Sequence, residues 1–455
     1  ADRKMVVAPR SLLALALLAP GTLGAECNGD ATPGPRNELP IDDAPPVFVR
    51  EVSNGKLFTI GQGDDKKDLL HLYGTPYENG YAMGELQGDK AFGFVNDVYS
   101  YMEGQIVSNL NNETWCTQHA TARITCDDLR VVVKMGMTAA LNLSYYQTAP
   151  YIKPYVMEEI QGFADSSRGK VSAVDVRNVM WLGELTRGAC SMFGASGSAT
   201  SESRDGKLLQ LRALDWDVEG PFKNVATLVV YHPNPGDGHA WANLGFAGWT
   251  ASITGFSVEQ IGLSEIGVTY ADESFGPESY LAKGYPFGFL IRDVLQFDKT
   301  LDEATARITK ATRTCDLILG VGDGKVNDFS GFQYSPNVAT VIKPESLIPV
   351  NDTWHPKIDG IVYFGMDWIC PNDNSMLAHQ LQQFHGQLTP ELTISDVASY
   401  VRTGDLHIAI YDHAAMRMFI ATARPDGASG PLPAYQRQFT QLDMAALFAE
   451  PPPKA

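Results

Sequence analysis

The chain has 455 residues and a formal net charge of −18, with 44% hydrophobic and 19% charged residues. This composition is ordinary for a globular protein, and the length supplies a large hydrophobic core. The acidic balance argues against a nucleic-acid-binding protein, because such proteins normally present a basic face.

The first element predicted along the chain is a secretory signal peptide over residues 5–25. Arg10 supplies its basic start, Leu12–Pro20 its short apolar core, and Gly24-Ala25 its small-residue exit. A membrane span is the alternative, but a span needs roughly 18 apolar residues and this run is much shorter. Since no later stretch is long enough either, we expect a secreted or lysosomal (vacuolar) protein without stable membrane insertion.

Residues 26–189 are predicted to be mostly helical. Residues 26–47 are rich in Pro, Gly and Asp and predict an extended arm, and residues 48–73 predict short strands. Apolar residues then recur at helical spacing, and Ser172 is a plausible N-cap for the last helix. The predicted helices are Gly80–Gln105, Asp128–Leu143, Pro154–Phe163 and Val174–Leu185.

From Cys190 onward short strands dominate. The predicted strands are Lys207–Leu214, Ala226–His232, Ala240–Thr254, Gln260–Tyr270, Asp316–Gly320, Ala339–Ile342, Gly360–Gly365, Leu406–Asp412 and Arg417–Ala423. The predicted helices are Phe287–Phe297, Leu301–Thr312, Ser375–Phe384 and Ile394–Val401. Adjacent strands with segregated helices indicate an α+β layered fold. A precursor segment followed by a catalytic segment would change character at Cys190 in this way, and so would two ordinary domains.

The cysteines and the glycosylation sequences give only weak information on disulfides and on the secretory route. Cys116 and Cys126 are close together in a polar loop and could pair, and Cys315 with Cys370 is a possible second disulfide, but the connectivity stays open. Asn-x-Ser/Thr sequences support a secretory route only weakly. The candidate glycosylation sites are Asn112, Asn142 and Asn351.

Cys190 is the candidate nucleophile if the chain cuts itself in front of it. A thiol has a pKa of about 8.5 and an α-amine one of about 8, so an N-terminal cysteine can pass its thiol proton to its own amine and attack a carbonyl. Arg212 and Asp215, near the end of the next strand, would favour the thiolate and orient the ammonium. From these residues alone the alternative stays open: such a cysteine is usually a core residue, and an Arg-x-x-Asp pair is usually a solvated ion pair.

Cys190 at a strand start, followed by Arg-x-x-Asp on the next strand, resembles the N-terminal-nucleophile cysteine hydrolases. Bile-salt hydrolases, penicillin V acylase, acid ceramidase and isopenicillin-N acyltransferase belong to this family. The likeness runs in order from about Gly74 to near Phe448. The other similar segments are Gly74–Gly84, Ile261–Val268, Gly284–Pro286 with Leu290–Leu295, and His407–Asp412.

The resemblance implies a four-layer αββα sandwich, with residues 26–189 as a propeptide or α-chain and residues 190–455 as the catalytic β-chain. It implies self-cleavage between Ala189 and Cys190, followed by hydrolysis or acyl transfer at a linear amide. Cys190 would be nucleophile and N-terminal base, and Arg212 and Asp215 would orient and tune it. The implied partner is a small N-acyl or lipid substrate. No metal or cofactor is implied, and the nine histidines show no metal spacing.

The chain departs from the family pattern where the oxyanion would be held. Asp367 occupies the neighbourhood of the family's oxyanion-hole asparagine. An ionised carboxylate would repel an oxyanion, so either Asp367 is protonated, or it binds the substrate, or a donor comes from elsewhere. The family's late arginine is absent, and Arg402 is a distant candidate. The candidate donors are Ser274, Asn372 and Asn374.

Other sequence patterns bear on which class of protein this is. Gly320–Lys325 lacks the spacing of a phosphate-binding loop and predicts a turn, and no Gly-x-Ser-x-Gly elbow is present. The aromatic strand with Trp241, Phe246 and Trp249 predicts core, or the wall of an acyl-binding cleft. Two alternatives to an amidase stay open. One is a phospholipase-B-like acyl-ester hydrolase of the same fold, and the other is a non-catalytic secreted glycoprotein, which the departure at Met366-Asp367 keeps open.

Overall fold

The computed structural model describes residues 32–112, 126–185, 189–268, 271–277, 282–368 and 371–454. The predicted signal peptide lies outside the described residues, and so do Cys116 and Cys370, one half of each suggested disulfide. The side chains of Asn112, Asn372 and Asn374 are also outside the described part. These predictions therefore stay predictions.

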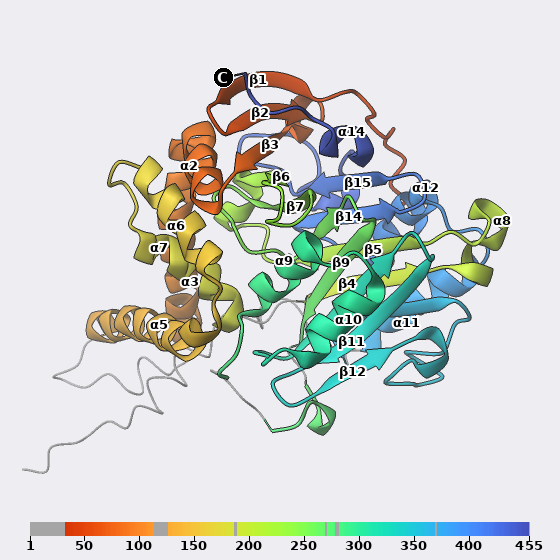
Figure 1. Cartoon of the computed structure of the whole chain (residues 1–455). Coiled ribbons are helices and arrows are strands. Elements are labelled where there is room, and N and C mark those ends of the chain that lie inside the picture. The colour runs from red at the N-terminus through yellow and green to blue at the C-terminus, as the bar shows by residue number, and fades with distance from the viewer. Residues whose placement is uncertain are drawn as a thin grey trace, which may run out of the picture.

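The described residues form an α+β protein with two sheets and surrounding helices (Figure 1). One sheet has the order β1-β2-β3-β6-β7-β8-β9-β10-β11-β12, and the other has the order β13-β4-β5-β14-β15-β16. The strands of the first are β1 Val47–Val52, β2 Gly55–Ile60, β3 Lys67–Gly74, β6 Ala226–Pro233, β7 Trp241–Phe246, β8 Gly255–Ser257, β9 Ile261–Gly267, β10 Leu317–Asp323, β11 Asp328–Tyr334 and β12 Ala339–Ile342. The strands of the second are β13 Ile361–Met366, β4 Ala189–Ala195, β5 Leu209–Asp215, β14 His407–Asp412, β15 Arg417–Thr422 and β16 Thr440–Asp443.

Helices from the first part of the chain gather on one side of the molecule, coloured red to yellow in Figure 1. They are α2 Pro76–Gln87, α3 Asp89–Asn112, α5 Cys126–Thr148, α6 Pro154–Ser166 and α7 Ala173–Leu185. The later helices are α8 Ser201–Arg204, α9 Phe287–Phe297, α10 Leu301–Lys310, α11 Pro371–Gln383, α12 Pro390–Leu392, α13 Ser399–Val401 and α14 Met444–Phe448. Across the part of the chain that the structure describes, no helix combines the length and apolar character of a membrane span.

The two sheets contact each other where β4 and β5 meet β9. Polar bonds cross this contact as well as apolar side chains. Gln210 Nε2 donates to Ser264 Oγ at 2.8 Å, and the Tyr411 hydroxyl donates to the Leu263 carbonyl at 3.0 Å. Because hydrogen bonds have narrow geometry, they fix how one sheet lies over the other.

The part of the chain before Cys190 is not a separately folded unit. β3 pairs with β6 in parallel, from Asp68 opposite Thr227 to Gly74 opposite Pro233. Strands from both sides of Cys190 therefore share one sheet, and two ordinary domains do not describe this fold.

Most predicted elements are present, and the differences have local causes. The helix predicted over Gly80–Gln105 is two helices, α2 and α3, because the chain turns at Gly88 with φ +54° and closes α2 with an N–H···O bond to Gly84. Ser172 caps α7 as predicted, accepting from the Asp175 N–H at 3.2 Å.

In the second half, the strand predicted over Ala240–Thr254 was too long. β7 ends at Phe246, the chain turns at Gly248 (φ +77°), and β8 begins only at Gly255. The helix predicted over Ile394–Val401 is a π-helix over Thr393–Ala398 that continues into α13. β11 and β16 were not predicted. The turn predicted over Gly320–Lys325 starts too early, because β10 continues to Asp323 and the chain turns into β11 only after that residue.

Helices α2 and α6 pack with their backbones in contact. A Cβ at Gly80 would lie 1.9 Å from the Glu159 carbonyl oxygen, and one at Gly162 would lie 2.0 Å from the Tyr77 carbonyl oxygen. Both obstacles are backbone atoms, so a side chain at either position would push the helices apart. This contact explains why the Gly74–Gly84 segment carries glycines at helical spacing.

We expect Gly162→Ala to lower the stability by about 1–3 kcal/mol, because the added methyl overpacks this contact. Gly93→Ala is the matched control, since it lies inside α3 with no atom within 4 Å of its added Cβ. It should be neutral or stabilising by up to ~1 kcal/mol. Thermal melting of the two variants tests this, and equal melting temperatures would contradict the packing argument.

Candidate active site

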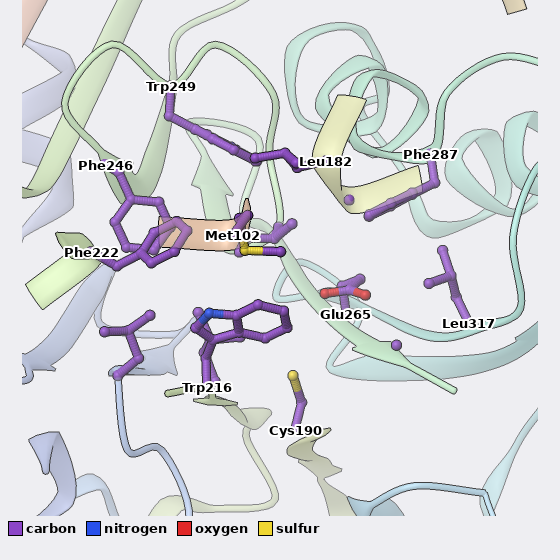
Figure 2. A pocket seen from close by; sticks show the side chains of 15 residues that line it. Met102, Leu182, Cys190, Trp216, Phe222, Phe246, Trp249, Glu265, Phe287 and Leu317 are labelled. Atoms are coloured by element: carbon purple, nitrogen blue, oxygen red, sulfur yellow. The ribbon is translucent and has the colours of Figure 1, made fainter. Parts of the chain in front are cut away.

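Cys190 lies at the start of β4, the second strand of the six-stranded sheet, between β13 and β5. It pairs with Leu214 of β5 on one side and with Met366 of β13 on the other, and Ala189 lies opposite Asp215. The residue is buried. Figure 2 shows its thiol pointing into a cavity, toward Trp216 and Glu265.

The cavity has a volume of about 100 Å³ and is almost entirely apolar. Its walls come from both sheets and from helices α3 and α7 of the first part of the chain. Cys190 and Glu265 are the two lining side chains that carry a titratable group. The remaining lining residues are Met102, Leu182, Gly183, Leu214, Trp216, Phe222, Phe246, Trp249, Ile253, Gly267, Phe287, Leu317 and Leu406.

Arg212 has no exposed surface and pairs with Glu265 of the cavity wall. Its Nη2 is 3.2 Å from Glu265 Oε2, so β5 of one sheet and β9 of the other are joined by a buried ion pair. Its Nη1 donates to the Ala213 carbonyl at 2.7 Å and its Nε to the Ile253 carbonyl at 3.3 Å. The guanidinium is therefore fixed in place by three different groups.

The Cys190 thiol is protonated in this environment. Burial raises its pKa to about 12, and the Glu265 and Asp215 carboxylates add to that increase. The positive charge of Arg212 and its hydrogen bond to the sulfur act in the opposite direction. Because a thiolate is the reactive form, the buried thiol needs a base to become a nucleophile.

Asp215 is held by a set of hydrogen bonds from the chain between α13 and β14. The Gly404 N–H donates to its Oδ1 at 2.6 Å, and the Asp405 N–H donates to the same oxygen at 3.1 Å. The Thr403 hydroxyl donates to Oδ2 at 2.6 Å and lies equally close to Ser191 Oγ. Since Thr403 has a single hydroxyl proton, Ser191 donates to it in turn. The carboxylate is thereby fixed on the residue of β5 that lies opposite Ala189 in the strand register.

Burial raises the pKa of Asp215 to about 6, although the hydrogen bonds from Thr403, Gly404 and Asp405 act to lower it. The group is therefore ionised at neutral pH and takes up a proton in mildly acid solution. An ammonium placed at residue 190 would face a carboxylate in the first case and a neutral acid in the second.

The two predicted oxyanion candidates whose side chains are described, Asp367 and Ser274, have different surroundings. Asp367 is buried one residue beyond the Met366 partner of Cys190, and its Oδ1 accepts from the Trp368 N–H at 2.6 Å. The Ser274 hydroxyl donates to Asp272 Oδ1 at 2.5 Å, so its proton is already used. Neither side chain lines the cavity, and their roles stay predictions. Arg402 lies near the surface and donates to the Tyr435 hydroxyl at 3.4 Å.

Two important groups were missed by sequence reasoning. Glu265 was quoted only as part of a similar segment, and Thr403 was not considered. The signal for Glu265 was present in Gly262–Gly267, where a single charged residue lies in an otherwise apolar and small-residue strand. Thr403 carries no comparable signal, because a threonine before glycine is typical of any turn.

The other singled-out residues are accounted for by packing. Phe246 and Trp249 line the cavity, as the acyl-cleft alternative requires, whereas Trp241 stacks on Tyr231 with ring centroids 4.4 Å apart. His407 is a buried histidine bonded to Thr254 Oγ1 at 2.9 Å. Within the described ranges, no cluster of three or more His, Cys, Asp or Glu side chains could hold a metal ion.

Cys315 and the two described glycosylation candidates lie away from the cavity lining. The Cys315 thiol donates to Glu184 Oε2 at 3.1 Å. Asn142 Oδ1 accepts from Arg177 at 2.5 Å, and Asn351 Oδ1 accepts from the Thr353 N–H at 2.9 Å. Their modification stays a prediction.

The chain has relatives among curated proteins. Protein dcd1A of Dictyostelium discoideum is 33% identical over 434 residues, which are 91% of this chain and 93% of that protein. The chain belongs to the family of dcd1A. Protein dcd1B of the same organism is 30% identical over 427 residues, 91% of this chain and 81% of that protein.

Among solved structures, this chain is similar to the Caenorhabditis elegans ortholog of N-acylethanolamine-hydrolyzing acid amidase. It aligns with 50% of this chain and 93% of its own, at 17% identity and a TM-score of 0.37. No protein-family model matches the chain.

Asp215 is expected to make the folding stability depend on pH. Its pKa is 3.8 ordinarily and about 6 in the fold, so the folded chain holds a proton that the unfolded chain releases. Its stabilising contribution is present below pH ~4 and is lost as the pH rises through ~6. Asp215→Asn cannot ionise, so its melting temperature relative to the parent should be higher at pH 7.5 than at pH 4, by about 1–3 °C.

Both proteins in this comparison carry Cys190→Ala, so that the predicted self-cleavage plays no part in it. The pH dependence of their difference isolates Asp215 from the other carboxylates, which titrate alike in both. A difference that stays constant from pH 4 to pH 7.5 would contradict the raised pKa.

Proposed function

We propose that this protein is a self-cleaving cysteine amidase of the N-terminal-nucleophile type, acting on linear amides with an apolar acyl group. One observation carries the proposal. The Cys190 thiol opens into an apolar cavity, beside the buried Arg212–Glu265 pair, and Asp215 is fixed opposite the peptide bond that precedes it. A core cysteine needs neither a cavity nor charged neighbours.

In the proposed cut, Cys190 Sγ attacks the Ala189 carbonyl carbon and its proton goes to the departing Cys190 nitrogen. The Ala189–Cys190 C–N bond breaks, and a thioester joins the Ala189 acyl group to Cys190 Sγ. Water then hydrolyses the thioester. The products are a carboxylate on Ala189 and a free thiol and α-amine on Cys190.

In the proposed turnover, the new α-amine accepts the thiol proton and becomes an ammonium, which Asp215 holds. The thiolate, stabilised by Arg212, attacks the acyl carbon of the substrate amide. The ammonium returns its proton to the leaving amine, and water hydrolyses the remaining thioester. The amine thus supplies the base that a buried thiol with a pKa of about 12 lacks.

The proposal includes the layered architecture and the route of the protein. Helices α9 and α10 contact the sheet of β9, α11 contacts β13 of the other sheet, and the two sheets contact each other. This order supports a four-layer αββα fold with residues 26–189 as α-chain and residues 190–455 as β-chain.

Secretion or delivery to a lysosome or vacuole follows from the predicted signal peptide over residues 5–25.

The proposed substrate is a small molecule that enters with its acyl group. An apolar cavity favours a hydrocarbon acyl group because its burial is worth about 25 cal/mol per Å². Ser274, Asp367 and Asn372 remain candidates for the oxyanion or for the amine part of the substrate. Asp367 directly follows Met366, the strand partner of Cys190.

The purified full chain tests the cut directly. We expect intact-mass measurement and N-terminal sequencing to find a fragment that begins at Cys190, and Cys190→Ala to stay whole. The cleaved protein should hydrolyse acyl p-nitroanilides, and Cys190→Ala should lose at least ~10³-fold in rate, as expected when a covalent nucleophile is removed.

Met192→Leu is the control, because Met192 is a buried apolar residue on the same face of β4. It should cut and turn over like the parent. A chain that stays whole after prolonged incubation at acid pH, with Cys190→Ala behaving like the parent in hydrolysis, would overturn the proposal and leave a non-catalytic glycoprotein as the better explanation.

A further inference from the structure

Met102 occupies a central place in the cavity wall. It is buried and lines the same cavity as Cys190. In Figure 2 its thioether is drawn amid the lining, with Cys190 and Trp216 below it and Trp249 and Leu182 above it. Met102 belongs to α3, so this part of the wall comes from the chain before Cys190.

The cavity is too small for a long hydrocarbon chain. An apolar cavity of roughly 150 Å³ accommodates benzene, and this one has about 100 Å³. By the same measure it holds an apolar group of about four carbons. A longer acyl chain enters only if one of the wall side chains gives way.

Five of the wall side chains are large, rigid aromatic groups. Trp216, Phe222, Phe246, Trp249 and Phe287 are aromatic side chains packed among the two sheets and their helices. Met102 differs from these aromatic residues because its unbranched thioether is flexible. Such a side chain adapts to the gap that its neighbours leave. Its size therefore decides how much room the acyl group has.

The backbone that carries Met102 is held against the loop after β5. The neighbouring Tyr101 hydroxyl donates to the Asp217 carboxylate. The Tyr101 ring also lies directly on Gly220, where a Cβ would meet the ring at 2.8 Å. α3 is thus anchored one residue away from Met102, and the side chain cannot retreat by a shift of the helix.

We infer that Met102 sets the length of acyl group that the cavity accepts, so that the protein takes short acyl amides and excludes long-chain lipid amides. This inference rests on the proposed amidase function and names its substrate class. Met102 is a specificity residue and touches the end of the acyl group, away from the reacting atoms.

The test uses straight-chain acyl p-nitroanilides of two to twelve carbons with the cleaved protein. We expect the parent to prefer chains of about four carbons. Met102→Ala removes three heavy atoms and should move the optimum to chains about three carbons longer, with a gain of about tenfold or more in kcat/KM for those chains relative to the short ones. Met102→Val should move it in the same direction by less, and serves if the alanine variant does not fold.

Met137→Ala is the matched control. Met137 is a buried methionine of α5 in the same core, and it does not line the cavity. We expect it to lower stability like Met102→Ala while keeping the chain-length optimum of the parent. An optimum that moves equally in both variants would show a general loosening of the core and overturn the inference.

A second readout separates this inference from the proposed function. Binding of n-alkanols of two to twelve carbons, followed by calorimetry, needs no catalysis. If no anilide is hydrolysed but the alkanol length limit rises in Met102→Ala, the amidase proposal fails and the role of Met102 stands. If anilides are hydrolysed with one length optimum in the parent and both Met102 variants, and alkanol binding is also unchanged, Met102 does not set the length.

Discussion

The buried ion pair between Arg212 and Glu265 is the contact on which the rest of the site depends. It joins the two sheets at the point where they enclose the cavity. Taking both charges out of water has a large free-energy cost, and removing either partner would leave the other buried and unneutralised. The pair therefore fixes how the sheets face each other, and it also sets the charge that Cys190 senses.

The same burial that encloses Cys190 in the cavity keeps its thiol protonated and therefore unreactive. In the uncut chain its pKa of about 12 leaves almost no thiolate at neutral pH, despite the neighbouring guanidinium. In other thiol enzymes a histidine general base removes the thiol proton. Here the buried His407 is bonded to Thr254, and burial lowers its pKa well below the ordinary value. The proposed α-amine answers the same need within Cys190 itself, at the position that Asp215 faces.

Sequence reasoning reached the groups that neighbouring strands bring together. Cys190, Arg212 and Asp215 lie on β4 and β5, which pair directly, so strand spacing was enough to place them near one another, and their roles stay predictions. Glu265 and Thr403 lie 53 and 188 positions from the partners that they bind. These contacts arise from packing of one sheet on the other and from a distant loop, so a local pattern can single out Glu265 as a charged strand residue but cannot name its partner. The break at Gly88 was missed for a smaller reason, because one glycine in an apolar periodic run is often tolerated.

The chain before Cys190 has three structural roles. It covers β6 with β3, and without it the backbone groups of that strand edge would lose their partners. It also closes the cavity with Met102 and Leu182, on α3 and α7. The buried ion pair of Glu159 with Arg292, 2.6 Å apart, ties α6 to α9 across the same boundary. A protein that lost residues 26–189 after the proposed cut would expose a sheet edge, an apolar cavity and a buried arginine at once, so that cut would change the connectivity at Cys190 and leave the packing in place.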